Sequence, residues 1–149
     1  MTTYTPPSPL TNYSHNSQDN TLKHVSISTT VNSSPLTITN IYIPPCTSCP
    51  PNYIPDLTRL LSTDADTIIA SDINAHHPTW FSQTRDDRAA ARGDVIDATI
   101  NNSPFLTLNE DSFTRIPRNG EPSSPDVTFI SAHIALQPTW TTYNTLDSD

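Results

Sequence analysis

The sequence has little glycine, little positive charge and no long apolar run. Of its 149 residues 2 are glycine and 15 are proline. This excludes a collagen-like repeat, and because proline breaks helices it also excludes a coiled coil or a helical bundle. No apolar segment approaches the roughly 20 residues that span a bilayer. The N-terminus has neither the basic cluster nor the apolar core of a signal peptide. We therefore expect an intracellular chain that does not associate with membranes.

Charged residues are scarce and mostly acidic. There are 7 lysines and arginines against 15 aspartates and glutamates, which gives a formal net charge of −8. Proteins that bind nucleic acid usually carry an excess of cations for phosphate contacts, so net charge by itself argues against DNA binding. Net charge describes the whole surface, however, and says little about one site built around a metal ion.

Alternating polar and apolar residues predict a strand-rich chain. Residues 1–22 are polar and aperiodic, and we expect them to be a disordered or loosely attached lead-in to a domain over 23–149. Strands are predicted, the first two as a hairpin, over 23–31, 36–43, 66–70, 105–108, 112–115, 127–130 and 139–143. Helices are predicted over 53–61 and over 87–101, where Val95, Ile96 and Ile100 would be buried. The tally favours a mixed α/β (α+β) fold of packed layers.

The first candidate site follows the predicted strand 66–70, in a segment 71–85 that is expected to be a loop. Asp72 and Asn74 are two residues apart, so an extended backbone would point both side chains the same way. A carboxylate beside a carboxamide can hold a divalent metal, orient a water and contact an anionic substrate. The alternative is that these two residues simply form a turn.

Other residues with reactive or recognition chemistry each allow two interpretations. Cys46 and Cys49 have zinc-knuckle spacing but no second Cys/His pair, which favours a reduced pair in a loop. His76 and His77 either lie near a site or pack on the surface. Two tryptophans are core anchors or base-stacking platforms. Three arginines in and just before the long helix contact phosphates or form a solvated ion-pair face. These are Trp80 and Trp140, and Arg85, Arg88 and Arg92.

An ordered series of motifs resembles the endonuclease domain of non-LTR (LINE-type) retrotransposons, a member of the endonuclease/exonuclease/phosphatase superfamily. The motifs extend from the second predicted strand to the last residue. They are Asn40-Ile-Tyr42-Ile-Pro44-Pro45, Ser71-Asp72-Ile-Asn74-Ala-His76-His77, Trp80, Arg92-Gly93, Asn109, Phe113-Thr114-Arg115, Ser124-Pro125-Asp126-Val-Thr128, Trp140 and Ser148-Asp149. The resemblance implies a four-layer sandwich in which two mixed β-sheets are flanked by helices.

The resemblance also implies roles for individual residues. The catalytic residues would be Asp72, Asn74, Tyr42 and Asp126; the substrate-binding residues Thr114, Ser148 and His76; and the metal ligands Asp149 and Asp72. It implies Mg²⁺ or Mn²⁺ as cofactor and duplex DNA as substrate, nicked to prime reverse transcription. The full-length element would carry a reverse transcriptase, and cleavage of chromosomal DNA would require a nuclear location.

Some parts of the family pattern are missing from this sequence. The family has a histidine after the position of Asp149, and an asparagine and a metal-binding glutamate on strands before this region. Ser71 replaces the usual glycine before the aspartate. We therefore expect about the C-terminal two-thirds of a domain that is truncated at both ends. Three hypotheses follow: a metal-dependent endonuclease or a fragment of one, a catalytically inactive retrotransposon remnant, or an unrelated binding module rich in Ser, Thr and Pro.

Overall fold

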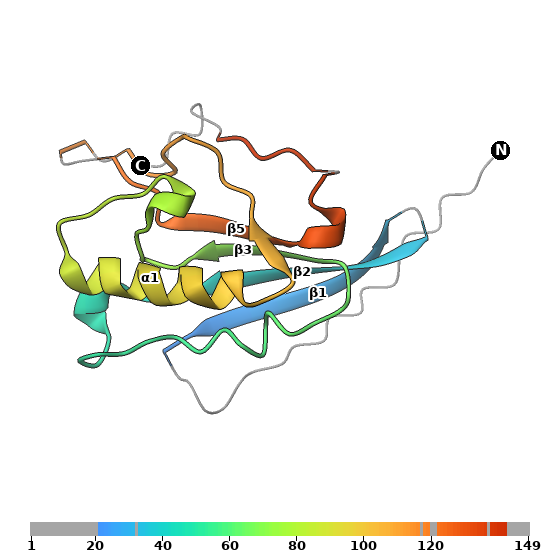
Figure 1. The fold of residues 1–149 in the computed structure, drawn as a ribbon, viewed down its shortest axis with the longest axis horizontal. Helices are drawn as coiled ribbons and strands as arrows, with labels where there is room; N and C mark the ends of the chain where they lie inside the picture. The colour runs from blue at the N-terminus through green and yellow to red at the C-terminus, as the bar shows by residue number, and fades with distance from the viewer. Residues whose placement is uncertain (1–20, 32, 117, 120–121, 137, 143–149) are drawn as a thin grey trace.

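The computed structural model describes residues 21–31, 33–116, 118–119, 122–136 and 138–142. In these ranges the chain forms a five-stranded mixed sheet with one α-helix packed on one face (Figure 1). The elements are β1 (Lys23–Val31), β2 (Ser34–Tyr42), β3 (Thr67–Asp72), α1 (Asp87–Asn101), β4 (Phe105–Thr107) and β5 (Asp126–Ser131). The strand order is β1-β2-β3-β5-β4. The predicted mixed α/β class is therefore confirmed.

The hairpin, the central strand and the long helix form where the sequence predicts them. β1 and β2 pair antiparallel, β3 is parallel to β2, and β5 is antiparallel to β3. Helix α1 begins after Asp86, whose carboxylate accepts hydrogen bonds from the backbone N–H groups of Arg88 and Ala89. Such a cap satisfies donors that the first turn of a helix leaves free. Val95, predicted to be buried, is instead exposed on α1.

The predicted helix over 53–61 is wrong, because that segment is irregular except for a turn near its end. Pro55 lacks the backbone N–H that a helix requires. The Asp56 carboxylate accepts from the backbone N–H of Thr58, a local bond that competes with helix formation. Leu57 and Leu61 are nevertheless buried in the core, so the segment covers α1 and the sheet without regular structure.

Two further strand predictions are wrong. In 112–115 only Arg115 makes a bridge, to Ser123, and residues 139–142 form no strand. Pro122 and Pro125, which flank Ser123 closely, have no N–H to extend that ladder. Trp140, in the second segment, donates its indole N–H to the Thr128 hydroxyl and so contacts β5 by its side chain. Residue 143 lies outside the described residues.

The core lies between α1 and one face of the sheet. Buried side chains of β2, β3 and β5 meet Ile96 and Ile100 of α1, and Trp80 is fully buried beside them. Helix α1 comes very close to the loop after β3, because a Cβ built on Gly93 would lie 2.0 Å from the carbonyl oxygen of His76. Leu22, expected to belong to the lead-in, is also buried in this core; residues 1–20 lie outside the description.

The other face of the sheet carries a row of aliphatic residues, one from each strand. The row runs through Ile27, Ile38, Ile68, Ile130 and Leu106, which are cross-strand neighbours. Its two ends are open, since Ile27 is 44% and Leu106 50% exposed. The two-sheet, four-layer arrangement stays a prediction, because the described residues form a single sheet. No helix among them is long and apolar enough to cross a bilayer.

Candidate active site

Three of the predicted catalytic side chains lie in one row across the sheet. Tyr42 at the end of β2 is the register partner of Asp72, and Asp72 is opposed to Asp126 at the start of β5. Directly opposed residues of neighbouring strands project from the same face. The segment 71–85 was predicted to be a loop, but Ser71 and Asp72 belong to β3 and the loop begins after them. The row of Tyr42, Asp72 and Asp126, here called the site row, projects from the face opposite α1.

Asn74 returns its side chain to the site row through a sharp turn. Its φ is 44°, in the left-handed region that asparagine tolerates better than most residues. The Nδ2 group donates to Asp72 Oδ1 at 2.6 Å and to the Ile43 carbonyl oxygen at 3.1 Å. The backbone does not stay extended as the sequence analysis assumed. Asn74 therefore forms the turn and also contacts the carboxylate, so the two interpretations of this pair are compatible.

The pKa of the Asp72 carboxyl is raised above its ordinary value of 3.8. Burial is the largest cause and the nearby negative charge of Asp126 the next. Hydrogen bonds from the backbone and side chain of Asn74 and the positive charge of Arg115 act in the opposite direction. Two carboxylates thus repel each other at one end of the sheet, and a cation bound near them would relieve that repulsion.

The start of β5 is held in place by two polar side chains. Thr114 Oγ1 accepts from the backbone N–H of Asp126 at 3.3 Å, and Asn109 Nδ2 donates to the Asp126 carbonyl at 3.0 Å. Asn109 also accepts from the N–H of Thr128 at 2.8 Å. Thr114 is thus brought to the site row, where it fixes the backbone that carries Asp126. No histidine of the described ranges forms an ion pair with Asp126.

His76 connects the loop after β3 to the segment before β5. Its Nδ1 is 2.8 Å from the Ser82 hydroxyl, which also accepts from the backbone N–H of Ser124 at 3.1 Å. The pKa of His76 is lowered from its ordinary value of 6.5, mainly by burial; Asp86 opposes this shift and Arg115 adds to it. The imidazole is therefore kept neutral over more of the acidic range than a free histidine.

A surface cavity of about 920 Å³ opens beside His76. Its lining combines cations with aromatic rings, since Arg85 and Arg115 face it together with Phe81 and Phe113. Both phenylalanines are partly exposed to solvent. The other lining residues are Pro78, Gln83, Thr84, Asp111, Pro122 and Ser123. Arginine side chains and exposed rings are the groups that contact phosphates and bases in nucleic-acid grooves.

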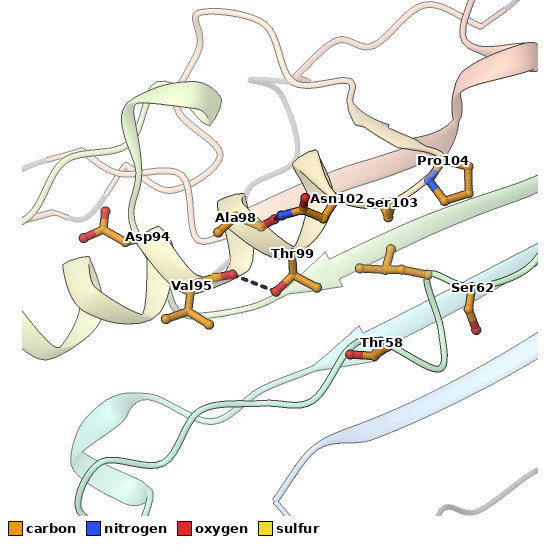
Figure 2. A pocket seen from close by; sticks show the side chains of 10 residues that line it. Thr58, Ser62, Asp94, Val95, Ala98, Thr99, Asn102, Ser103 and Pro104 are labelled. Carbon is orange, nitrogen blue, oxygen red and sulfur yellow. Dashed lines mark hydrogen bonds between the residues drawn. The ribbon is translucent and has the colours of Figure 1, made fainter.

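A second cavity, of about 630 Å³, lies between α1 and the turns that replace the predicted helix 53–61. Figure 2 shows Thr58 and Ser62 on one side and Val95, Ala98 and Thr99 of α1 on the other. The Thr99 hydroxyl donates a hydrogen bond to the Val95 carbonyl oxygen at 2.7 Å. Asp94 is the one charged residue of the lining. This cavity contains none of the predicted site residues.

The structure decides several of the open alternatives. Trp80 is a core anchor, with 0% exposure and its indole N–H on the Ala75 carbonyl. His77 packs against α1, near Asp94 at 3.7 Å and Asp97 at 3.5 Å. Cys46 and Cys49 are free thiols, and the described chain contains no group of three or more metal-binding side chains. Arg85 and Arg88 are exposed.

Two arginines acquire roles that sequence reasoning did not assign. Arg115 was quoted only as part of a motif, yet it lies close enough to Asp72 and His76 to shift both pKa values. Arg92 was expected on a solvated face but is 2% exposed. The signal for Arg92 was its position, because with Ala89 and Ile96 it follows the helical spacing of the buried stripe. Ser148 and Asp149 lie outside the described residues.

Comparison with known proteins identifies the family. A family model described as "Endonuclease-reverse transcriptase" matches residues 36–149. The chain belongs to this endonuclease–reverse transcriptase family. It is also similar in structure to the "Endonuclease domain of TRAS1, a telomere-specific non-LTR retrotransposon", with a TM-score of 0.56 and 21% sequence identity. No curated protein matches the sequence.

The resemblance to the retrotransposon endonuclease domains is thus confirmed, and the family is a nuclease family. The similarity covers 78% of this chain and 59% of the TRAS1 chain. The chain therefore spans less than two thirds of the length of that endonuclease domain. At 21% identity the structural likeness concerns the fold. The matched range 36–149 contains the whole site row and Asn74.

Proposed function

We propose that this chain carries the phosphodiester-hydrolysing site of a metal-dependent DNA endonuclease. The observation that carries the proposal is the site row, in which Asp72 has Tyr42 on one side and Asp126 on the other while the Asn74 amide binds its carboxylate. Membership of a nuclease family supports the reaction class. The nick would leave a 3′-hydroxyl that primes reverse transcription, so the substrate would be chromosomal duplex DNA in the nucleus.

The residues at the site row fit a hard divalent cation such as Mg²⁺ or Mn²⁺. Asp72 and Asp126 offer carboxylate oxygens on one face of the sheet, and the charge of Asp126 adds to the burial that raises the pKa of Asp72. Mg²⁺ is typically held by one or two carboxylates and keeps several waters. Asp72 would be a ligand, and Asp149 is proposed as another from the family resemblance. A bound cation would neutralise charge on the phosphate.

The side chains of the site row and Asn74 would each have a separate role in the reaction. Asp72 is placed to accept a hydrogen bond from the attacking water and to orient it. Asn74 holds the Asp72 carboxylate through its amide N–H. The Oδ1 atom of Asn74 remains available for other contacts. The Tyr42 side chain is 39% exposed at the end of β2, where its hydroxyl can donate to a phosphate oxygen. The resemblance assigns Asp126 to orient the family's histidine, which is one of the parts missing from this sequence.

The DNA strand is proposed to enter along the cavity beside His76. Arg85 and Arg115 face this cavity, so the local charge is positive although the whole chain is acidic. Arg115 also lies near enough to Asp72 to lower its pKa, and we propose that it binds a phosphate next to the site row. Thr114 fixes the backbone of Asp126 and would approach the same strand. Ser148 is proposed as a further substrate contact from the resemblance.

Nicking of supercoiled plasmid tests the proposal. We expect conversion to the open circle with Mg²⁺ or Mn²⁺, no conversion with EDTA, and nicks that a DNA polymerase extends because they carry a 3′-hydroxyl. Asp72→Asn should lower the rate on the order of 10²- to 10⁴-fold. Asp64→Asn is the matched control, since Asp64 is an exposed aspartate away from the site row.

Two outcomes would overturn the proposal. One is nicking that persists in EDTA or in Asp72→Asn, which would place the activity elsewhere or in a contaminant. The other is a folded chain that neither nicks DNA nor shows Mn²⁺-induced broadening of the Tyr42, Asp72 and Asp126 NMR signals. That second result would identify a catalytically inactive remnant of an endonuclease.

A further inference from the structure

Arg92 is a buried charged residue without an acidic partner among the described residues. Its exposure is 2%, and the ion pairs found in those ranges all involve histidine. Burial of an unpaired cation is unfavourable unless new contacts compensate for the lost water. A neutral side chain would complete the buried stripe of α1 at lower cost. The guanidinium therefore needs an explanation other than packing.

The guanidinium binds backbone carbonyls at the ends of two strands. Nη1 donates to the Pro44 oxygen at 2.8 Å and to the Asn74 oxygen at 3.4 Å. Pro44 lies two residues after Tyr42, and Asn74 lies two residues after Asp72. Arg92 thus ties together the backbone that follows two neighbouring members of the site row. Nη1 binds both carbonyls while Nη2 of the same planar group binds Cys49, an arrangement that a lysine ammonium reproduces poorly.

Other contacts fix the guanidinium and the helix that carries it. Nη2 donates to Cys49 Sγ at 3.3 Å, and the Tyr53 ring centroid is 5.8 Å from Cζ. The adjacent Gly93 lets α1 approach the backbone of His76, which is in the same loop as Asn74. The Nε group has no hydrogen-bond partner within the described structure. Arg92 is thus held in this position although one of its donors is unsatisfied.

Asn74 is the contact that links Arg92 to the chemistry. Its φ of 44° lies in the left-handed region, which asparagine tolerates better than most residues but which no residue with a side chain favours. The backbone must keep this conformation for the side-chain amide to reach Asp72 at 2.6 Å. Arg92 binds the carbonyl oxygen of the same residue. Loss of that contact would allow the turn to relax and the amide to leave the carboxylate.

We propose that Arg92 is a positioning residue of the nuclease site, which holds the Pro44 and Asn74 carbonyls and thereby keeps the Asn74 amide on the Asp72 carboxylate. Its effect on cleavage rests on the proposed function, whereas its effect on Asn74 does not. Arg92 is too deeply buried to touch DNA. It acts through the backbone of Asn74.

Kinetics of plasmid nicking separate this role from the alternatives. In Arg92→Lys and Arg92→Met we expect kcat to fall about 10- to 100-fold at unchanged KM, as for displacement of a catalytic group by about 1 Å. Each substitution should add little in an Asn74→Ala background, because both changes remove the same arrangement. A folded Arg92→Lys variant with unchanged kcat would overturn the proposal. A raised KM with weaker salt dependence would do so too, since it would indicate a DNA contact.

An NMR measurement tests the geometry without any activity. In the unsubstituted chain the two Asn74 side-chain N–H signals should be separate and protected from solvent. In Arg92→Lys they should move toward the values of a free amide, while Arg88→Lys, an exposed substitution on the same helix, should leave them in place. Unmoved Asn74 signals in Arg92→Lys would overturn the proposal. A wild-type chain that does not nick would contradict the proposed function alone.

A milder variant covers the case in which the Arg92 substitutions prevent folding. Cys49→Ala removes the acceptor of Nη2 at a partly exposed position and leaves both carbonyl contacts available. We expect Asn74 signals displaced in the same direction by a smaller amount, and a smaller loss of kcat. Asn74 signals identical to those of the wild type would count against the positioning role.

Discussion

Asp72 and Asp126 are directly opposed in the antiparallel pairing of β3 with β5, so two carboxylates share one end and one face of the sheet. Asp72 is half-buried whereas Asp126 is exposed, and the pKa of Asp72 is raised by its own burial and then by the charge of Asp126. The two carboxylates are therefore electrostatically coupled before any ligand arrives. This coupling can be tested without DNA.

Removal of the Asp126 charge should lower the pKa of Asp72. In Asp126→Asn the repulsion disappears while burial remains, so the pKa should move part of the way back toward 3.8. Carboxyl ¹³C NMR titration in metal-free buffer measures the midpoint directly. Asp64→Asn, which removes an exposed charge from another loop, should leave it unchanged. An Asp72 midpoint that does not respond to Asp126→Asn would contradict the assigned coupling.

Asp72→Asn should stabilise the fold at neutral pH while it removes activity. Because the pKa of Asp72 is higher in the folded chain than its ordinary 3.8, ionisation favours the unfolded state as pH rises through the folded pKa. An asparagine avoids that penalty and keeps an oxygen for the Asn74 amide. Urea unfolding should give the variant a higher midpoint at pH 7 and a similar one near pH 3. A variant that is less stable at pH 7 would refute this expectation.

His76 should make the fold sensitive to mild acid. Its pKa is lowered below 6.5 in the folded chain, so between 6.5 and the folded pKa the unfolded state binds the proton first. Stability is therefore lost as pH falls through this window. His76→Gln, which can still bond Ser82, should lose less stability between pH 7 and pH 5 than the wild type. Equal losses in the two proteins, measured by urea unfolding at both pH values, would exclude this role.

Gly93→Ala should destabilise the chain although alanine is the better helix former. Alanine gains about 1 kcal/mol in helix propensity over glycine. The new Cβ, however, would lie 2.0 Å from the His76 carbonyl oxygen, and such overpacking typically costs about 1–3 kcal/mol. Ala91→Gly, at an exposed position of α1, is the control and should cost only the propensity term. Thermal or urea unfolding compares them, and a more stable Gly93→Ala would show that α1 and the loop can separate easily.

Local patterns were sufficient to predict α1 and most of the sheet. The spacing of Ile96 and Ile100 predicted the helix, and alternation predicted β1 and β2. Alternation shows which residues share a face but does not show what covers that face. An alternating strand is typically buried on its apolar face, yet Val25 and Ile27 of β1 are 43% and 44% exposed. Whether the apolar face of a strand is buried or exposed depends on contacts between distant segments, which a periodic pattern does not encode.

The site was predictable only in part for the same reason. Asp72 and Asn74 could be found because they are two residues apart after an apolar run. Tyr42 and Asp126 came from the family resemblance, since only strand pairing brings them beside Asp72. Arg92 was misassigned, because its aspartate neighbours in the sequence suggested a solvated face while its helical position placed it inward.

The residues of the site row are direct pairing partners on three neighbouring strands, so the site depends on strand register. Successive residues of a strand point to opposite faces, so a slip of β3 by one residue would put Ser71 in the row and turn Asp72 toward the core. The burial of a carboxylate among the apolar residues near α1 would oppose such a slip. The arrangement of Tyr42, Asp72 and Asp126 thus does not exist in any intermediate in which β2, β3 and β5 are not yet aligned. The carboxylates of Asp72 and Asp126 therefore lie side by side only in the fold whose strands are correctly paired.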